Sequence, residues 1–160
     1  MLMNDFAAHQ VTRSHVLHIN GQSDDVFGLF DPIGEKKWSA EWDPKMIFPP
    51  SQVCQGAVFV TRDEEETETI WIITMLDQNS HCIAYTSVTP NFKVSLIEIS
   101  CERDGVNRTK ARVTYIITAL SEKGNQYVDS FSEEHYHQWM MDWEKAINHY
   151  LESGCPFRHH

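Results

Sequence analysis

The sequence predicts an α+β domain in which a curved antiparallel β-sheet wraps round one long C-terminal helix. Residues 68–78, 81–90, 92–103 and 108–120 form consecutive strand-like runs joined by short turns. Residues 124–152 then show the aromatic, amphipathic pattern of a single helix. A sheet that curves round such a helix tends to leave a space between the two. The sequence therefore also predicts an apolar cavity.

Size and charge limit the classes of function. The chain has 160 residues, which is typical of one domain, and its formal net charge is −10. This charge argues against a nucleic-acid partner and against attraction to anionic lipid, because both need clustered Lys and Arg. No apolar run approaches the roughly 18 residues of a spanning helix, and no secretory signal is visible. We expect a cytoplasmic protein without membrane insertion, either a monomer or a homodimer.

No linker or repeat divides the chain. We expect a loose N-terminal leader at residues 1–12, a single domain at 13–153 and a frayed C-terminal tail at 154–160. Gly154 and Pro156 mark the end of the long helix. The two terminal histidines are either native or a cloning remnant.

The first third of the domain combines one strand with two short helices. Residues 13–20 alternate as a strand does. Ser23 is a candidate N-cap for the first short helix, and Asp31-Pro32 is typical of the start of the second. Residues 39–56 have the irregular composition of a loop, and residues 57–62 follow as a strand. The acidic run after it, from Asp63 to Glu66, is typical of an exposed turn.

The later strands differ in how many of their faces are apolar. Residues 69–76 are apolar on both faces, which predicts a strand that is covered on both sides or lies at the sheet centre. Residues 109–120 alternate strictly, so one face is expected to point inward and the other to water. The expected inward set of this strand is Ala111, Val113, Tyr115, Ile117 and Ala119.

Cysteine and histidine spacing predicts no metal site and no catalytic nucleophile. Cys54, Cys82, Cys101 and Cys155 form no close pairs, and we expect free thiols. His135 and His137 are two residues apart on a helix and cannot easily share an ion. Glu133 and His137 are four apart, which predicts a surface pair. No phosphate-binding loop is present either, so we expect no cofactor and assign no catalytic residue.

The chain resembles the START-like, or SRPBCC, superfamily, and within it the polyketide cyclase/dehydrase and lipid-transport group of small bacterial proteins. The likeness spans residues 13 to 152. It is carried by FGLFDPIGEKKWSAEWDP (27–44), TIWIITMLD (69–77), YTSVTP (85–90), TYIITALSEKGN (114–125) and WEKAINHYL (143–151). The resemblance implies a helix-grip (START/Bet v 1-like) fold, with two short helices after the first strand closing one end of an apolar cavity.

The aromatic residues are the candidate ligand-binding groups. They would be core residues in any ordinary protein, but some are expected to line the cavity, where a Tyr hydroxyl or an indole N–H orients a polar end of the ligand. Trp38 and Trp42 fall in the lid region, where they serve either as a gate or as an apolar staple between the short helices. The full candidate set is Trp38, Trp42, Phe59, Trp71, Ile73, Tyr85, Ser87, Ile97, Ile99, Tyr115, Ile117, Phe131, Trp139 and Trp143. Ser95 and Thr118 are further buried polar candidates.

Three functions stay open from the sequence. The first is a protein that binds a small hydrophobic molecule, such as a lipid, sterol or polyketide, without covalent chemistry. The second is a cyclase or dehydratase in which Tyr85, Tyr115 or Glu98 moves a proton, although Glu98 has outward parity. The third is an interaction protein resembling the chaperone-ATPase activators of the superfamily, with the acidic run at 63–68 as a candidate contact. Fold alone does not choose among them.

Overall fold

A computed structural model describes residues 5–157, so the two terminal histidines lie outside the described residues. The strands are β1 (Gln10–Ile19), β2 (Lys45–Phe48), β3 (Val58–Arg62), β4 (Glu68–Asp77), β5 (Cys82–Thr89), β6 (Lys93–Arg103) and β7 (Thr109–Ala119). The helices are α1 (Ser23–Phe27), η1 (Gly28–Phe30), η2 (Gly34–Lys37), α2 (Glu122–Ser130) and α3 (Glu133–Ser153). No helix within residues 5–157 is long and apolar enough to cross a membrane.

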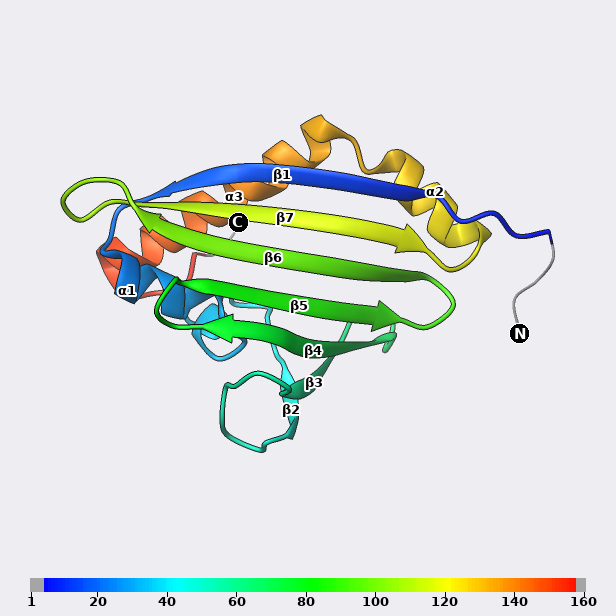
Figure 1. The fold of residues 1–160 in the computed structure, drawn as a ribbon, viewed down its shortest axis with the longest axis horizontal. Coiled ribbons are helices and arrows are strands. Elements are labelled where there is room, and N and C mark those ends of the chain that lie inside the picture. Colours follow the sequence, from blue (N-terminus) through cyan, green and yellow to red (C-terminus); the bar gives the residue numbers. More distant parts are fainter. Residues whose placement is uncertain (1–4, 158–160) are drawn as a thin grey trace.

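The seven strands form one antiparallel sheet in the order β1-β7-β6-β5-β4-β3-β2. The chain runs through neighbouring strands from β2 to β7, and β1 then closes the free side of β7 along its whole length. Helix α3 crosses the concave face behind β1 and β7, while α1 and the short helices lie at one end (Figure 1). This arrangement confirms the predicted α+β helix-grip architecture.

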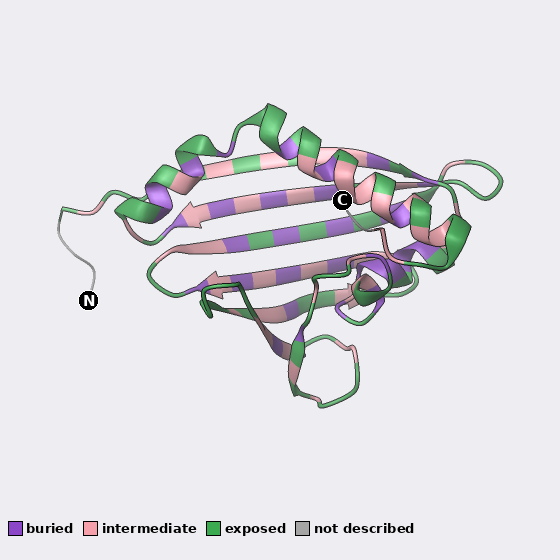
Figure 2. Ribbon diagram, turned by 180° about the vertical axis from the view of Figure 1, so that it is seen from behind, coloured by how far each residue is buried: buried purple, intermediate pink, exposed green. Residues whose placement is uncertain are grey.

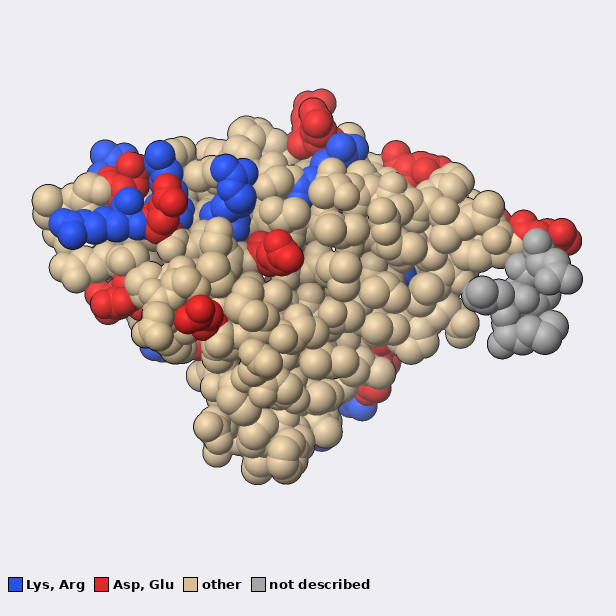
Figure 3. All heavy atoms as spheres, in the orientation of Figure 1, with Lys and Arg blue, Asp and Glu red and all other residues tan. Residues whose placement is uncertain are grey.

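Alternation along β5, β6 and β7 places every second side chain in the interior. The buried bands on these strands line up across the sheet and face α3 (Figure 2). The inward set predicted for β7 is buried, from Ala111 to Ala119. The outer face is largely uncharged, and its Lys and Arg residues gather at the β6–β7 hairpin end (Figure 3). Period-two patterning therefore predicted the inward face of β7 correctly.

The long C-terminal helix was predicted as one element and is two. Helix α2 ends at Ser130, and α3 begins at Glu133 with Ser132 as N-cap. The Ser132 hydroxyl accepts a hydrogen bond of 3.0 Å from the His135 amide, and Glu133 and Glu134 occupy the first turn. Both features favour a helix start. The apolar period continues through the break, which is why periodicity alone suggested a single helix.

The edge of the sheet also differs from the prediction. Lys45–Phe48, inside the segment predicted as a loop, forms the short edge strand β2. The doubly apolar strand β4 lies near this edge, and its outer side chains Ile70 and Met75 are 36% and 37% exposed. Strand β4 is therefore apolar on both faces although its outer face is not covered by other elements. At the termini, β1 begins at Gln10, within the predicted leader, and Phe157 of the predicted frayed tail bridges to Ser39.

Asp31 and Gly34 determine the path of the lid helices. The Asp31 carboxylate accepts hydrogen bonds from the amides of Ile33 and Gly34, at 2.9 and 2.6 Å, and so starts η2. Gly34 packs so closely on η1 that a Cβ atom there would lie 1.8 Å from the Gly28 carbonyl oxygen. Only glycine fits this contact, and the contact places the next residue, Glu35, at the cavity.

We expect Gly34→Ala to destabilise the protein by about 1–3 kcal/mol, because the added methyl group pushes η2 away from η1. The matched control is Gly28→Ala, where a Cβ meets no atom within 4 Å. The control is expected to be neutral or stabilising by up to about 1 kcal/mol. Urea unfolding of both variants measures the difference, and equal stabilities would show that the contact at Gly34 is unimportant.

Candidate functional site

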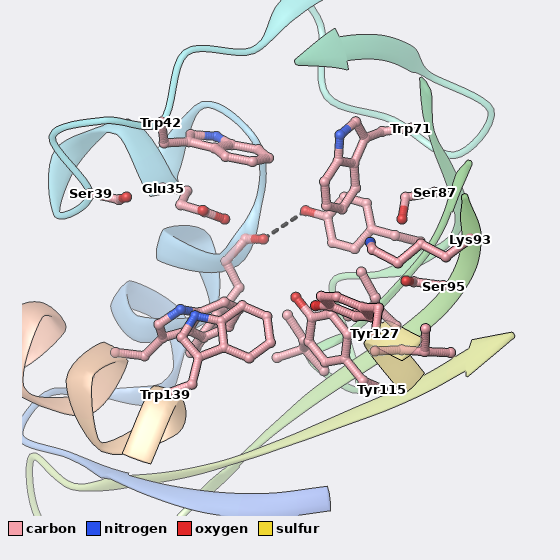
Figure 4. A pocket seen from close by; sticks show the side chains of 16 residues that line it. Glu35, Ser39, Trp42, Trp71, Ser87, Lys93, Ser95, Tyr115, Tyr127 and Trp139 are labelled. Carbon is pink, nitrogen blue, oxygen red and sulfur yellow. Dashed lines mark hydrogen bonds between the residues drawn. The ribbon is translucent and has the colours of Figure 1, made fainter. Parts of the chain in front are cut away.

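A cavity of about 360 Å³ lies between the concave face of the sheet, the lid helices and the α2–α3 region. Strands β4 to β7 form one wall, η1, η2 and the loop after η2 form the lid, and α3 closes the remaining side (Figure 4). Its lining residues are Phe30, Glu35, Ser39, Trp42, Trp71, Tyr85, Ser87, Lys93, Ser95, Ile97, Ile99, Tyr115, Ile117, Tyr127, Trp139 and Trp143.

Most of the residues proposed from sequence meet in this cavity. They are Trp42, Trp71, Tyr85, Ser87, Ile97, Ile99, Tyr115, Ile117, Trp139 and Trp143. The other four, Trp38, Phe59, Ile73 and Phe131, do not line it. All four are buried in the surrounding core. Trp38, only 2% exposed, donates its indole N–H to the Leu29 carbonyl at 2.7 Å and holds the lid rather than gating it.

The sequence analysis did not select six lining residues. Phe30, Ser39 and Tyr127 lie in segments that were assigned to short helices, a loop and the last helix. Ser95 was noted only as a buried polar position. Glu35 and Lys93 carry charges, and charged residues are usually exposed, so neither was considered. Only Lys93 carried a signal in the sequence, and it was weak: Lys93 has the inward parity of Ser95 and Ile97.

Several polar groups of the aromatic residues on the cavity wall already form hydrogen bonds within the protein. The Tyr85 hydroxyl donates to the Phe30 carbonyl at 2.7 Å. The indole N–H groups of Trp42 and Trp71 donate to the Pro32 carbonyl and the Thr61 hydroxyl, each at 2.9 Å. The donor groups of these three residues are therefore already used within the protein, and their rings remain for contact with a ligand. Burial also raises the pKa of Tyr85 well above its ordinary value, so it stays neutral.

Glu35 is the unusual group of the cavity. Its side chain faces the cavity and is otherwise surrounded by protein, and this burial raises its pKa from 4.5 to about 8. The neighbouring Asp31 carboxylate adds to the rise by repulsion. No hydrogen bond or cation within residues 5–157 offsets the burial. A carboxyl group in this setting is largely protonated at neutral pH and close to the point where it ionises.

Two further polar groups without a bonded partner lie on the sheet side of the cavity. The Ser95 hydroxyl is fully enclosed and has no hydrogen-bond partner among the described residues. Lys93 is half-buried, and desolvation lowers its pKa. Its ammonium group lies 5.4 Å from the Tyr127 ring centroid and forms no ion pair within residues 5–157. Glu35 and the Lys93–Ser95 pair face the cavity from opposite sides (Figure 4).

Within residues 5–157, no three His, Cys, Asp or Glu residues are arranged to hold an ion, and the four cysteines are free thiols. The predicted Glu133–His137 pair is absent: the His137 ring contacts His15 at 4.6 Å, and Glu133 lies 3.9 Å from Arg13. Glu98 is exposed and Thr118 binds Gln10 outside the cavity, so neither belongs to the site.

We expect the free energy of unfolding to fall as pH rises from about 4.5 to 8, because Glu35 titrates in this range. The unfolded carboxyl group ionises near pH 4.5 and the folded one near 8, so between these values the folded state holds the extra proton. The slope approaches about 1.4 kcal/mol per pH unit for this group. Glu35→Gln should flatten the slope in urea titrations from about pH 5 to 8, whereas Glu41→Gln, an exposed neighbour, should not. Equal slopes in both variants would contradict the assignment.

Comparisons with known proteins extend the structural result. No family model and no curated protein matches the sequence. The structure is similar to norcoclaurine synthase from Thalictrum flavum, with a TM-score of 0.65, 10% identity and coverage of 96% of this chain and 97% of that one. Zhui aromatase/cyclase from Streptomyces sp. R1128 gives a TM-score of 0.66, 14% identity and coverage of 93% and 100%. An uncharacterised protein from Rhizobium leguminosarum gives 0.62, 15% identity and coverage of 91% and 97%. The chain therefore shares the helix-grip fold of these solved structures.

Proposed function

We propose that this protein binds a compact, mostly apolar small molecule in the cavity between the sheet, the lid and α3. The observation that carries the proposal is the cavity itself, which has a volume of about 360 Å³ and an aromatic lining. Small-molecule sites are typically concave, largely apolar and about 300–1,000 Å³ in volume. This cavity is at the lower end of that range, which favours a compact ring system over a long-chain lipid.

The aromatic lining supports a ligand with flat apolar surfaces. Trp42 and Trp71 meet edge to face with ring centroids 5.4 Å apart, and Trp139 and Trp143 do the same at 5.3 Å. Tyr115 contacts Trp139 at 5.0 Å. Such rings hold one another in place, so they offer a ligand preformed faces at little cost in conformational entropy.

Cyclase or dehydratase activity is the second candidate function, and Glu35 is the observation that favours it. A carboxyl group that ionises near pH 8 holds and releases protons at physiological pH, as a general acid or base must. Tyr115 lines the same cavity, and the charge of Glu35 raises its pKa further. Conversion of a polyketide analogue by the wild type and not by Glu35→Gln, with binding retained in both, would favour this function.

Of the three candidate functions, the interaction protein has the least support from the structure. Asp63 caps the β3–β4 turn through hydrogen bonds of 2.9 Å from the amides of Glu65 and Thr67 to its carboxylate. This role accounts for Asp63 at the start of the run. The exposed carboxylates that follow need no partner in water.

We expect Ser87→Phe to fill the cavity and weaken uptake of the neutral dye Nile red by more than about tenfold, because the ring would occupy the ligand space. The matched control is Thr86→Phe, whose side chain lies on the outer face of the same strand. Fluorescence titration measures the dye, and circular dichroism checks that both variants fold. Native mass spectrometry of the purified wild type should also retain an extra mass of a few hundred daltons. Undiminished uptake by Ser87→Phe, or no uptake by the wild type, would refute the proposal.

A further inference from the structure

The cavity holds a buried acid that the protein itself leaves unpaired. Glu35 faces the aromatic interior, and no described residue donates a hydrogen bond to its carboxylate or supplies a cation to it. Burying an ionisable group without a partner is costly, and a carboxyl group retained only for structure would normally bond to a neighbouring amide or hydroxyl. The missing partner is therefore expected to come from a ligand.

The rings beside Glu35 suit a cation as well as an apolar group. Trp42, Tyr85, Tyr115, Trp139 and Trp143 line the same cavity. A cation over the face of a Trp or Tyr ring is attracted by the ring electrons, more strongly when it is desolvated, and aromatic cages recognise quaternary ammonium groups in this way. A carboxylate among several aromatic rings is thus a combination that favours a positively charged amine with apolar substituents.

The opposite wall presents the complementary chemistry. The Lys93 ammonium and the unbonded Ser95 hydroxyl are hydrogen-bond donors that face the same cavity. Donors without partners favour an oxygen acceptor on the ligand, such as a carbonyl, ether or phenol. They also disfavour an amine at that end. Glu35 lies on the opposite side of the cavity from Lys93 and Ser95 (Figure 4). A bound molecule with two different ends would therefore have one preferred orientation.

We propose that the ligand is an aromatic or polycyclic amine whose protonated or quaternary nitrogen pairs with the Glu35 carboxylate, while an oxygen acceptor at its other end meets Lys93 and Ser95. This inference rests on the proposed function, because it names the chemical class of the molecule that occupies the same cavity. It also predicts a coupling between binding and protonation.

The proton balance follows from the groups that surround Glu35. Asp31 lies on the preceding turn, with Lys37 near it on η2, and Tyr85 and Tyr115 face Glu35 from the sheet. Lys93 lies across the same cavity, where desolvation lowers its pKa. Both tyrosines remain neutral across the useful pH range because burial raises the pKa of each. In the empty cavity Glu35 is about nine-tenths protonated at pH 7, since its pKa is about 8. Binding a fixed cation must therefore release close to one proton from Glu35 to solvent.

The test uses phenethyltrimethylammonium and its neutral isostere, in which carbon replaces nitrogen. The cation cannot titrate, so any pH dependence belongs to the protein. Affinity for the cation is expected to rise roughly tenfold per pH unit from about pH 6 to 7.5 and to level off above pH 8, whereas affinity for the isostere should not rise. Calorimetry in buffers of different ionisation enthalpy counts the released proton. Glu35→Gln should abolish both the rise in affinity and the proton release. The control Glu41→Gln removes a carboxylate at an exposed position, and it should preserve both effects.

The possible results distinguish failure of the amine-ligand inference from failure of the proposed binding function. A preference of at least about tenfold for the cation at pH 8.5, lost in Glu35→Gln, supports the inference. Binding of the isostere and of Nile red without any preference for the cation overturns it and leaves the proposed function standing. Failure of the wild type to bind any of the three probes overturns both. The comparison of cation and isostere in the wild type stands even if Glu35→Gln folds poorly.

Discussion

The site depends on the hydrogen bond from the Tyr85 hydroxyl to the Phe30 carbonyl. This bond of 2.7 Å joins the middle of the sheet to the end of η1, which are 55 residues apart in the sequence. It satisfies a buried hydroxyl and a carbonyl at a helix end together, and either group alone would be costly to bury. Trp38 and Trp42 add bonds to the Leu29 and Pro32 carbonyls. The lid is therefore held by the polar tips of aromatic side chains, while their rings face the core and the cavity.

The same arrangement explains why the interior stays partly empty. Tyr136 on α3 donates to the Val113 carbonyl of β7 at 2.6 Å, which anchors the helix to the sheet at a fixed distance. Large rings such as Trp139 and Trp143 then brace one another and cannot collapse inward without losing their contacts. A cavity in a protein interior costs dispersion energy. This fold maintains one because its walls are tied by directional bonds as well as by apolar packing.

The sequence predicted the wall of the site better than its chemistry. Strict alternation in β7 identified Tyr115 as an inward residue, because a period of two places every second side chain on the same face. Short-range signals were harder to interpret. Ser132 followed by two glutamates marked the start of α3, but the continuing apolar period concealed it.

Glu35 was out of reach of sequence reasoning for a physical reason. It stands beside Lys36 and Lys37 in a short segment, and such a cluster normally lies in water. Its burial follows from the approach of η2 to η1 at Gly34 and from the tyrosines of two distant strands, and none of these contacts leaves a local pattern. Charged residues buried by tertiary contacts are therefore the part of a site that patterning predicts least well.

The proposed ligand would also couple the protonation of Glu35 to the lid. In the empty protein Glu35 is mostly neutral, and a neutral acid is tolerated at the junction of η2 and the cavity. Ionised Glu35 without a partner would repel Asp31, which starts η2 through its bonds to the Ile33 and Gly34 amides. A cation that pairs with Glu35 removes this repulsion at the moment the carboxyl group ionises. With the proposed ligand bound, the protein would be more stable at high pH than without it, because the ligand supplies a positive charge next to the ionised Glu35 carboxylate.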